Sequence, residues 1–223
     1  MLRGCASNIC EQYYTKNENE IFSLGSFCYA PIFYTADNHK VLSPFRVDPL
    51  NGENTDFRII DYSDKLGNHP PIKELNLRKD ENYFVVRGKY RLVLILSVIS
   101  IKKGEPLSFS GDDINIFLCA PLISVKDHYS QEYIIDVQAF RYPNLFYLPP
   151  KDYVMESFVR FELIQPVNKG CLRPFKAKVS LSDDAYIYLL THLSRFLNNS
   201  FTDKDIQELI NMYSSELISK FNG

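Results

Sequence analysis

Hydrophobic residues along most of this chain form short runs that are separated by turn residues, a pattern typical of β-strands. Gly25 precedes a strand-like run that ends at Tyr34, and the run over 92–101 is so uniformly apolar that we expect a strand buried on both faces. Further strands are predicted at 83–86, 114–124, 133–140, 145–148 and 157–166. Many short strands in succession indicate a barrel or a sandwich.

The spacing of apolar residues changes near residue 181 from that of strands to that of helices. Ser182 followed by two aspartates predicts an N-cap, and apolar residues then recur at helical spacing. A second amphipathic helix is expected over 202–221, where Thr202 and Asp205 resemble a capping box. Both apolar stripes favour packing against the strands or against a partner subunit. We therefore expect an α+β, mainly β fold with two C-terminal helices.

A long polar segment, residues 35–80, separates the first predicted strand from the next and is rich in turn residues. Segments of this length without their own structure are uncommon in compact domains, so we expect either a functional lid or an excursion with one hairpin. The predicted organisation is an N-terminal extension over 1–22, a β domain over 23–180 that contains this insertion, and C-terminal helices over 181–223.

The composition is that of a globular protein, with 45% hydrophobic and 23% charged residues in 223 positions. The formal net charge of −2 gives no general attraction for nucleic acids, so an RNA site has to be a local basic pocket. No apolar run is long enough to span a membrane as a helix, and the five cysteines include no C-x-x-C pair. These features predict a protein without membrane contact that works in the reducing cytoplasm.

The chemistry-bearing residues exclude several common function classes. The chain has no motif for nucleotide hydrolysis, dinucleotide binding or α/β-hydrolase chemistry, and its four histidines and five cysteines lack the spacing of a zinc site. We therefore expect no metal and no cofactor.

Arg87, Lys89 and Arg91 form a cationic cluster at the start of the buried strand. An arginine at this position can hold a phosphate through two hydrogen bonds. The alternative is that the three cations belong to a solvent-exposed turn without a ligand.

The order of four fragments resembles the MazF/PemK family, which belongs to the CcdB/Kid superfamily of toxins from type II toxin–antitoxin systems. The fragments are GSFCYAPIF from Gly25, RLVLILS from Arg91, CAPLIS from Cys119 and ESFVRFELIQPV from Glu156, and a predicted helix follows from Ser182. The resemblance implies a twisted SH3-like β-barrel, a homodimer and an antitoxin protein as partner. It also implies an endoribonuclease that cleaves single-stranded RNA without a metal, by attack of a ribose 2′-OH on the neighbouring phosphate.

The resemblance assigns catalytic residues one at a time. The family's arginine in the second fragment falls on Arg91, and a serine of the third fragment falls on Ser124, while Ile123 stands where the family has a threonine. Glu162 and Gln165 occupy the positions nearest to the family's acidic residue and its second arginine. A glutamate can accept a proton, but a glutamine cannot act as a general acid, so the catalytic set is only partly retained.

His128 lies in the predicted loop after the third fragment and is a candidate for the missing acid, because imidazole titrates near neutral pH. An ordinary exposed loop histidine is the alternative. Arg160 lies two residues before Glu162 and on the same face of the predicted strand, which fits a structural ion pair or the edge of an active site. The candidate RNA-binding residues are Arg87, Lys89, Tyr90 and His128.

Two other functions fit the same sequence. A catalytically silent module of this fold would bind RNA or a protein partner, with Tyr29, Phe33 or Tyr90 stacking on bases. Alternatively, the insertion and the segment over 202–221 would form the surface that an antitoxin-like protein recognises.

Overall fold

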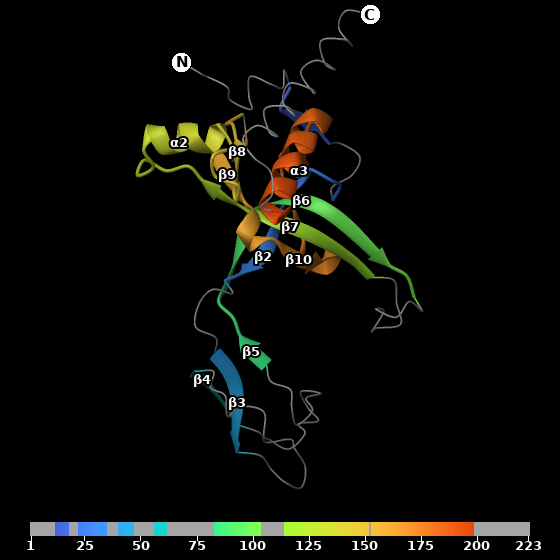
Figure 1. Ribbon diagram of the computed structural model, residues 1–223. Coiled ribbons are helices and arrows are strands. Elements are labelled where there is room, and N and C mark those ends of the chain that lie inside the picture. The colour runs from blue at the N-terminus through green and yellow to red at the C-terminus, as the bar shows by residue number, and fades with distance from the viewer. Residues whose placement is uncertain are drawn as a thin grey trace, which may run out of the picture. The chain divides into compact units, whose positions relative to one another are not determined.

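The computed structural model describes residues 12–17, 22–34, 40–46, 56–61, 83–103, 114–151 and 153–198. In this part of the chain the fold is α+β and mainly β, with antiparallel sheets and two α-helices, as Figure 1 shows. The chain divides into two compact units: unit 1 comprises Met1–Pro31 and Tyr90–Gly223, and unit 2 comprises Ile32–Lys89. No helix among the described residues is long and apolar enough to cross a membrane.

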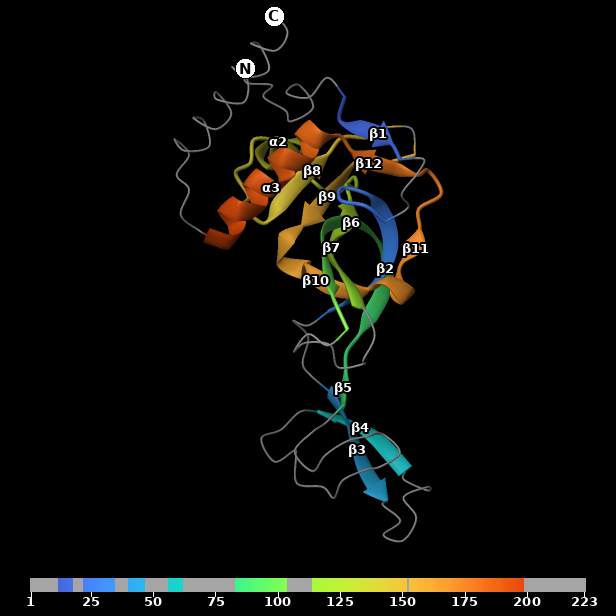
Figure 2. The same cartoon turned by 90° about the vertical axis from the view of Figure 1, so that its right-hand side faces the viewer.

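Most of the regular structure lies in unit 1. Its strands are β1 (Tyr14–Lys16), β7 (Ile114–Ser124), β8 (Leu145–Leu148), β9 (Ser157–Arg160), β10 (Gln165–Asn168), β11 (Arg173–Pro174) and β12 (Val179–Leu181), together with most of β2 (Phe27–Phe33) and of β6 (Gly88–Ile101). Two residues of each of these last strands belong to unit 2. Its helices are α2 (Gln131–Gln138), α3 (Asp183–Asn198) and the 3-10 helices η2 (Phe161–Leu163) and η3 (Lys169–Cys171). Figure 2 shows the same elements from a second side.

The main sheet of unit 1 is open. Its strand order is β11-β2-β6-β7-β9-β8, β10 also pairs with β7, and no ladder among the described residues joins β11 to β8. The predicted strand over 157–166 is interrupted by η2, so β7 pairs with β10 along one part of its length and with β9 along another. The predicted α+β, mainly β class is confirmed, whereas the described strands do not close into the predicted barrel.

One face of this sheet packs against α3. Leu94 of β6, Ala120 of β7 and Val159 of β9 belong to the same buried cluster as Leu189 of α3. Successive side chains of a strand point to opposite faces, so the neighbour of Val159 in β9, Phe158, points away from α3. The sheet therefore has an α3 face, which carries the main core, and an opposite face.

The opposite face packs against α2, and we call it the α2 face. Ile134 and Val137 of the helix join Leu145 and Phe158 in a second apolar cluster. The prediction of a strand at 133–140 is therefore wrong. Ser130 caps the helix by accepting a hydrogen bond from the backbone N–H of Tyr133, and the pair of buried residues three apart is helical spacing.

The first predicted C-terminal helix is confirmed as α3. The Ser182 hydroxyl accepts a hydrogen bond of 3.2 Å from the backbone N–H of Ala185, and Asp183 and Asp184 lie in the first turn. Both features stabilise a helix N-terminus. The second predicted helix, over 202–221, lies outside the described residues.

Part of the predicted N-terminal extension belongs to the core of unit 1. β1 pairs with β12, and Tyr13 and Tyr14 are only 6% and 5% exposed. The hydroxyl of Tyr13 donates to the carbonyl oxygen of Tyr147 over 2.9 Å, and that of Tyr14 donates to the carbonyl oxygen of Pro149 over 2.6 Å. These two bonds tie β1 to β8 and to the loop that follows it.

Unit 2 contains a small antiparallel sheet of three strands in the order β4-β3-β5, formed by β3 (Lys40–Arg46), β4 (Asp56–Asp61) and β5 (Tyr83–Val85). Val41 of β3 is fully buried in it. The predicted insertion over 35–80 thus contributes β3 and β4, and its remaining residues lie outside the described part of the chain.

Candidate functional site

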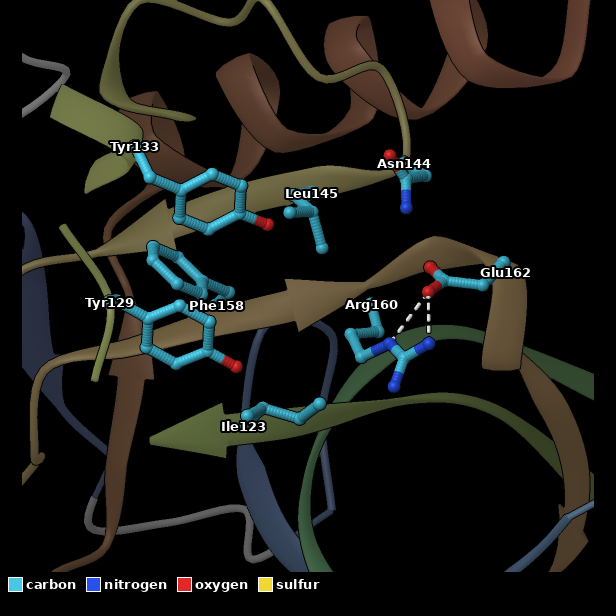
Figure 3. Close-up of a pocket in the computed structure, with 8 residues that line it drawn as sticks. All are labelled: Ile123, Tyr129, Tyr133, Asn144, Leu145, Phe158, Arg160 and Glu162. Carbon is cyan, nitrogen blue, oxygen red and sulfur yellow. Dashed lines mark hydrogen bonds and ion pairs between the residues drawn. The ribbon is translucent and has the colours of Figure 1, made fainter. Parts of the chain in front are cut away.

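A pocket of about 180 Å³ lies on the α2 face of unit 1 and is shown in Figure 3. Ile123 of β7 and Phe158 of β9 are register partners and form its floor. Leu145 of β8 closes one side, and α2 with the turn before it supplies the wall. The lining residues are Ile123, Tyr129, Tyr133, Asn144, Leu145, Phe158, Arg160 and Glu162.

Three aromatic rings form one end of this pocket. The rings of Tyr129 and Tyr133 are stacked, with centroids 5.5 Å apart and an interplanar angle of 13°. Phe158 meets both rings edge-on, at 5.6 Å and 6.0 Å. Such arrangements match the quadrupoles of aromatic rings and hold the rings in place. Figure 3 shows both tyrosine hydroxyls directed toward the opposite end of the pocket.

An ion pair occupies that opposite end. The Nε and Nη2 atoms of Arg160 lie 2.6 Å and 2.5 Å from the same carboxylate oxygen, Oε1 of Glu162. Both side chains are about one third exposed, at 32% and 30%. Figure 3 shows both contacts reaching this one carboxylate oxygen. The pocket therefore presents a carboxylate oxygen beside a fixed cation.

The two ends of the pocket influence each other electrostatically. Burial raises the pKa of Tyr133 above its ordinary value, and the neighbouring Tyr129 and Tyr142 raise this pKa further. Glu162 acts in the same direction, whereas the positive charge of Arg160 lowers the pKa of Tyr133. The phenol of Tyr133 thus keeps its proton at neutral pH and can donate a hydrogen bond to a ligand.

Helix α3 contacts the turn over residues 142–145, which contributes Asn144 and Leu145 to the pocket. The Nε2 atom of His192 lies 3.0 Å and 2.9 Å from the carbonyl oxygens of Tyr142 and Leu145. Because both partners are acceptors, this nitrogen carries the proton. Burial lowers the pKa of His192 to about 4, so the ring is neutral at pH 7. The backbone N–H of Phe161 donates to the carbonyl oxygen of Asn144 over 2.9 Å, which joins the same turn to the residue before Glu162.

The residues assigned to catalysis occupy different places in unit 1. Glu162 lines the pocket. Ser124 pairs with Ser157 at the start of β9, whereas Glu162 follows the end of β9. Arg91 is a half-buried residue of β6, and Gln165 begins β10 opposite Cys119. Of the assigned catalytic set, the lining of this pocket contains only Glu162, and it also contains Ile123.

The candidate RNA-binding residues are divided between the two units. The His128 ring lies 4.4 Å from the ring of Tyr129, next to the aromatic wall. Tyr90 also belongs to unit 1, where the guanidinium group of Arg173 lies 4.7 Å from its ring centroid. Arg87 and Lys89 belong to unit 2, and the guanidinium group of Arg87 lies 5.8 Å from the ring centroid of Tyr34.

Tyr129, Tyr133 and Asn144 were not predicted as site residues, and the strand expected at 133–140 is helix α2 (Gln131–Gln138). Ser130, followed three residues later by the first of several apolar residues at helical spacing, was the available indication. This indication of a helix was opposed by the run of β-branched and aromatic residues, which favours a strand.

Possible metal ligands do not cluster in the described part of the chain. No group of three His, Cys, Asp or Glu side chains there has the arrangement of a metal site. Cys28, Cys119 and Cys171 are free thiols, the first two buried and the third exposed.

No family model, no curated protein and no solved structure matches the chain. The resemblance to the MazF/PemK family stays a hypothesis that depends on the four sequence fragments.

Proposed function

We propose that the chain is a toxin-like endoribonuclease that cleaves single-stranded RNA without a metal ion, and that cleavage takes place in the pocket on the α2 face. The observation that carries this proposal is the Arg160–Glu162 ion pair at one end of a pocket whose other end is aromatic. Stacking, phosphate binding and proton transfer are the three functions that a nuclease of this kind needs.

The aromatic end suits a nucleobase. Unpaired bases can be stacked on tyrosine and phenylalanine rings, whereas bases in a duplex are not available for stacking. The volume of about 180 Å³ is below the usual range of about 300–1,000 Å³ for pockets that hold a drug-sized ligand. A pocket of this size suits a single base, which favours a single-stranded substrate.

The charged end suits the scissile phosphate. In the proposed reaction Glu162 takes the proton of the 2′-OH, the 2′ oxygen attacks phosphorus, and the bond from phosphorus to the 5′ oxygen breaks. The products are a 2′,3′-cyclic phosphate and a 5′-OH, whose oxygen takes its proton from solvent, because His128 lies beside Tyr129 at the aromatic end. Arg160 stabilises the negative charge that develops on the phosphate oxygens.

A catalytically silent module is the second candidate. Ile123 provides no hydroxyl at the floor of the pocket, and Arg160 already occupies one oxygen of the Glu162 carboxylate. A pocket in this state would bind RNA, or a protein partner, without chemistry. Its aromatic end would still contribute about 1–3 kcal/mol for each stacked base.

The finer parts of the resemblance belong to the same proposal. They are a MazF/PemK-like fold, with an open sheet in place of a closed barrel, a homodimer, an antitoxin protein as partner and a cytoplasmic location. The order of the fragments from Gly25 to Val167 supports the first three, and the cysteine content supports the last.

The test is a cleavage assay with purified protein and labelled single-stranded RNA in EDTA. We expect the wild-type protein to cleave, and Glu162→Gln to lower the rate about 10²–10⁴-fold because it removes the general base. Asp136→Asn is the matched control, since Asp136 pairs with Arg141 at 2.9 Å and does not line the pocket. Absence of cleavage by the wild-type protein would contradict the proposal, and binding without product would favour the silent module.

A further inference from the structure

A second and larger pocket, of about 440 Å³, lies beside β1 in unit 1. Lys16 of β1 and Lys151 and Tyr153 of the loop after β8 are among its lining residues. The described lining includes no carboxylate. The two lysines of the described lining offer ammonium groups that an anionic ligand can bind.

The loop that carries Lys151 and Tyr153 is fixed at both of its ends. The Tyr14 hydroxyl donates to the carbonyl oxygen of Pro149 over 2.6 Å, and burial raises the pKa of Tyr14, so this hydroxyl keeps its proton. Two backbone hydrogen bonds of 3.0 Å and 2.7 Å between Lys151 and Val154 close the turn. Tyr153 lies in this turn and is 75% exposed. An exposed aromatic ring thus lies two residues from a lysine that is hydrogen-bonded to Val154.

A second turn brings further lysines to the same region. Ala177 lines the pocket and is flanked in sequence by Lys176 and Lys178, both exposed. The backbone N–H of Asn17 donates to the carbonyl oxygen of Lys178 over 2.8 Å, which attaches this turn to the residue after Lys16. The basic character of the region therefore comes from three separate segments of the chain.

Ammonium groups beside an exposed aromatic ring match the two recurring parts of a nucleotide, since lysines bind phosphates and the ring stacks on a base. We propose that this pocket is a second nucleotide subsite for single-stranded RNA, with Lys16 and Lys151 on phosphates and Tyr153 on a base. The inference rests on the proposed function, because the ligand is a more distant part of the RNA that the α2-face pocket binds.

The two pockets have lining residues that lie close together along the chain. Leu145 lines the first pocket and Lys151 lines the second, and the six residues from one to the other span at most about 22 Å when fully extended. Sites for single-stranded nucleic acid cover about 4–16 nucleotides. The second subsite therefore adds affinity for longer RNAs and leaves the chemistry at the first pocket unchanged.

The experiment compares a dinucleotide with a single-stranded RNA of about ten nucleotides, within the range above, for binding and for cleavage by the full chain. For the longer RNA, we expect the double variant Lys16→Ala, Lys151→Ala to lower the magnitude of the slope of log K against log salt by about 1.4, the value for two phosphate contacts to a single strand. We expect Tyr153→Ala to weaken binding about 5- to 150-fold and Tyr153→Phe to bind like the wild type, because only the ring is needed.

Cleavage of the dinucleotide, which fills only the first pocket, is expected to stay at the wild-type rate in these variants. Lys169→Ala is the matched control, since Lys169 is exposed and lines neither pocket. If the Lys16, Lys151 and Tyr153 variants all bind the longer RNA like the wild type, the second subsite is wrong and the proposed function stands. If they weaken binding while no RNA is cleaved, the subsite is supported and the nuclease is wrong. A wild-type protein that binds no RNA overturns both.

Discussion

The same strands of unit 1 form two very different faces. On the α3 face, Leu122 and Val159 pack into the main core beneath a helix of 16 residues. On the α2 face, their neighbours Ile123 and Phe158 lie beside a helix of only 8 residues. At 1.5 Å per residue the two helices are about 24 Å and 12 Å long, so α2 leaves part of its face uncovered. The pocket therefore lies on the face that is covered by the shorter helix.

The difference predicts that substitutions on the α3 face change stability, whereas those in the pocket change RNA binding and cleavage. Leu189→Ala on the α3 face is expected to give the largest loss, about 2–5 kcal/mol in the free energy of unfolding, because Leu189 is fully buried. Urea unfolding of the variant and the wild type measures it. Cleavage per folded molecule should be unchanged, and a loss below about 1 kcal/mol would contradict the assignment of this face as the main core.

The next effect in size concerns His192, which connects the α3 face to a wall of the pocket. Its pKa is lowered from 6.5 to about 4 in the folded protein, because burial disfavours the charged ring. The unfolded chain therefore binds a proton below pH 6.5 that the folded protein does not bind until about pH 4. The contribution of His192 to the free energy of unfolding is fully present above pH 6.5. It falls by about 3 kcal/mol as the pH is lowered to 4.

Urea unfolding across this pH range checks the prediction, with His192→Gln as the control. The amide of glutamine can donate to the carbonyl oxygens of Tyr142 and Leu145 but does not titrate. The difference in stability between the wild type and the variant should therefore depend on pH only between about 4 and 6.5. Parallel curves for the two proteins would show that His192 is not buried in the neutral state.

A third prediction concerns the aromatic wall of the pocket. Tyr133→Ala is expected to weaken binding of single-stranded RNA by about 1–3 kcal/mol, because it removes a ring available for stacking. Tyr133→Phe keeps the ring and should retain most of the affinity. Fluorescence anisotropy with a labelled RNA measures both variants, and equal affinities for the alanine variant and the wild type would place the bound bases elsewhere.

The smallest expected effect on stability belongs to the ion pair in the pocket. Arg160→Ala should change the free energy of unfolding by less than about 1 kcal/mol, because both partners are about one third exposed and screened by water. The same substitution should slow RNA cleavage by at least about tenfold, since the phosphate loses its cation. A large loss of stability without loss of cleavage would make the pair structural, as the sequence alone allowed.

The sequence predicts elements well where local pattern and packing agree. The strand at 114–124 is found at the same residues as β7, the strand at 145–148 is β8, and the cap at Ser182 begins α3. α2 was misassigned because Tyr133, Ile134 and Val137 favour a strand when taken locally, while their place in the fold depends on contact with β8 and β9. In unit 2, the strand predicted at 83–86 is β5, and β3 and β4 form the hairpin that was one expectation for the insertion. The pairing of β3 with β5 is not predicted by local pattern.

The candidate site was predictable only in part, for the same reason. Arg160 and Glu162 were expected on one face because they are two residues apart in a predicted strand. They do meet, but through the turn from β9 into η2 rather than through strand alternation. The stacked rings of Tyr129 and Tyr133 could not be placed beside them from the sequence, since this proximity arises when α2 packs on the sheet.

The claim that the α2 face binds single-stranded RNA is tested most directly by NMR of the tyrosine rings, with the Glu162→Gln variant so that the RNA is not cleaved. Tyr188 is the internal control, because it is buried on the α3 face. We predict that the ring resonances of Tyr129 and Tyr133 shift and saturate on titration with a short RNA, while those of Tyr188 stay in place. RNA binding that leaves the Tyr129 and Tyr133 resonances unmoved would contradict the account.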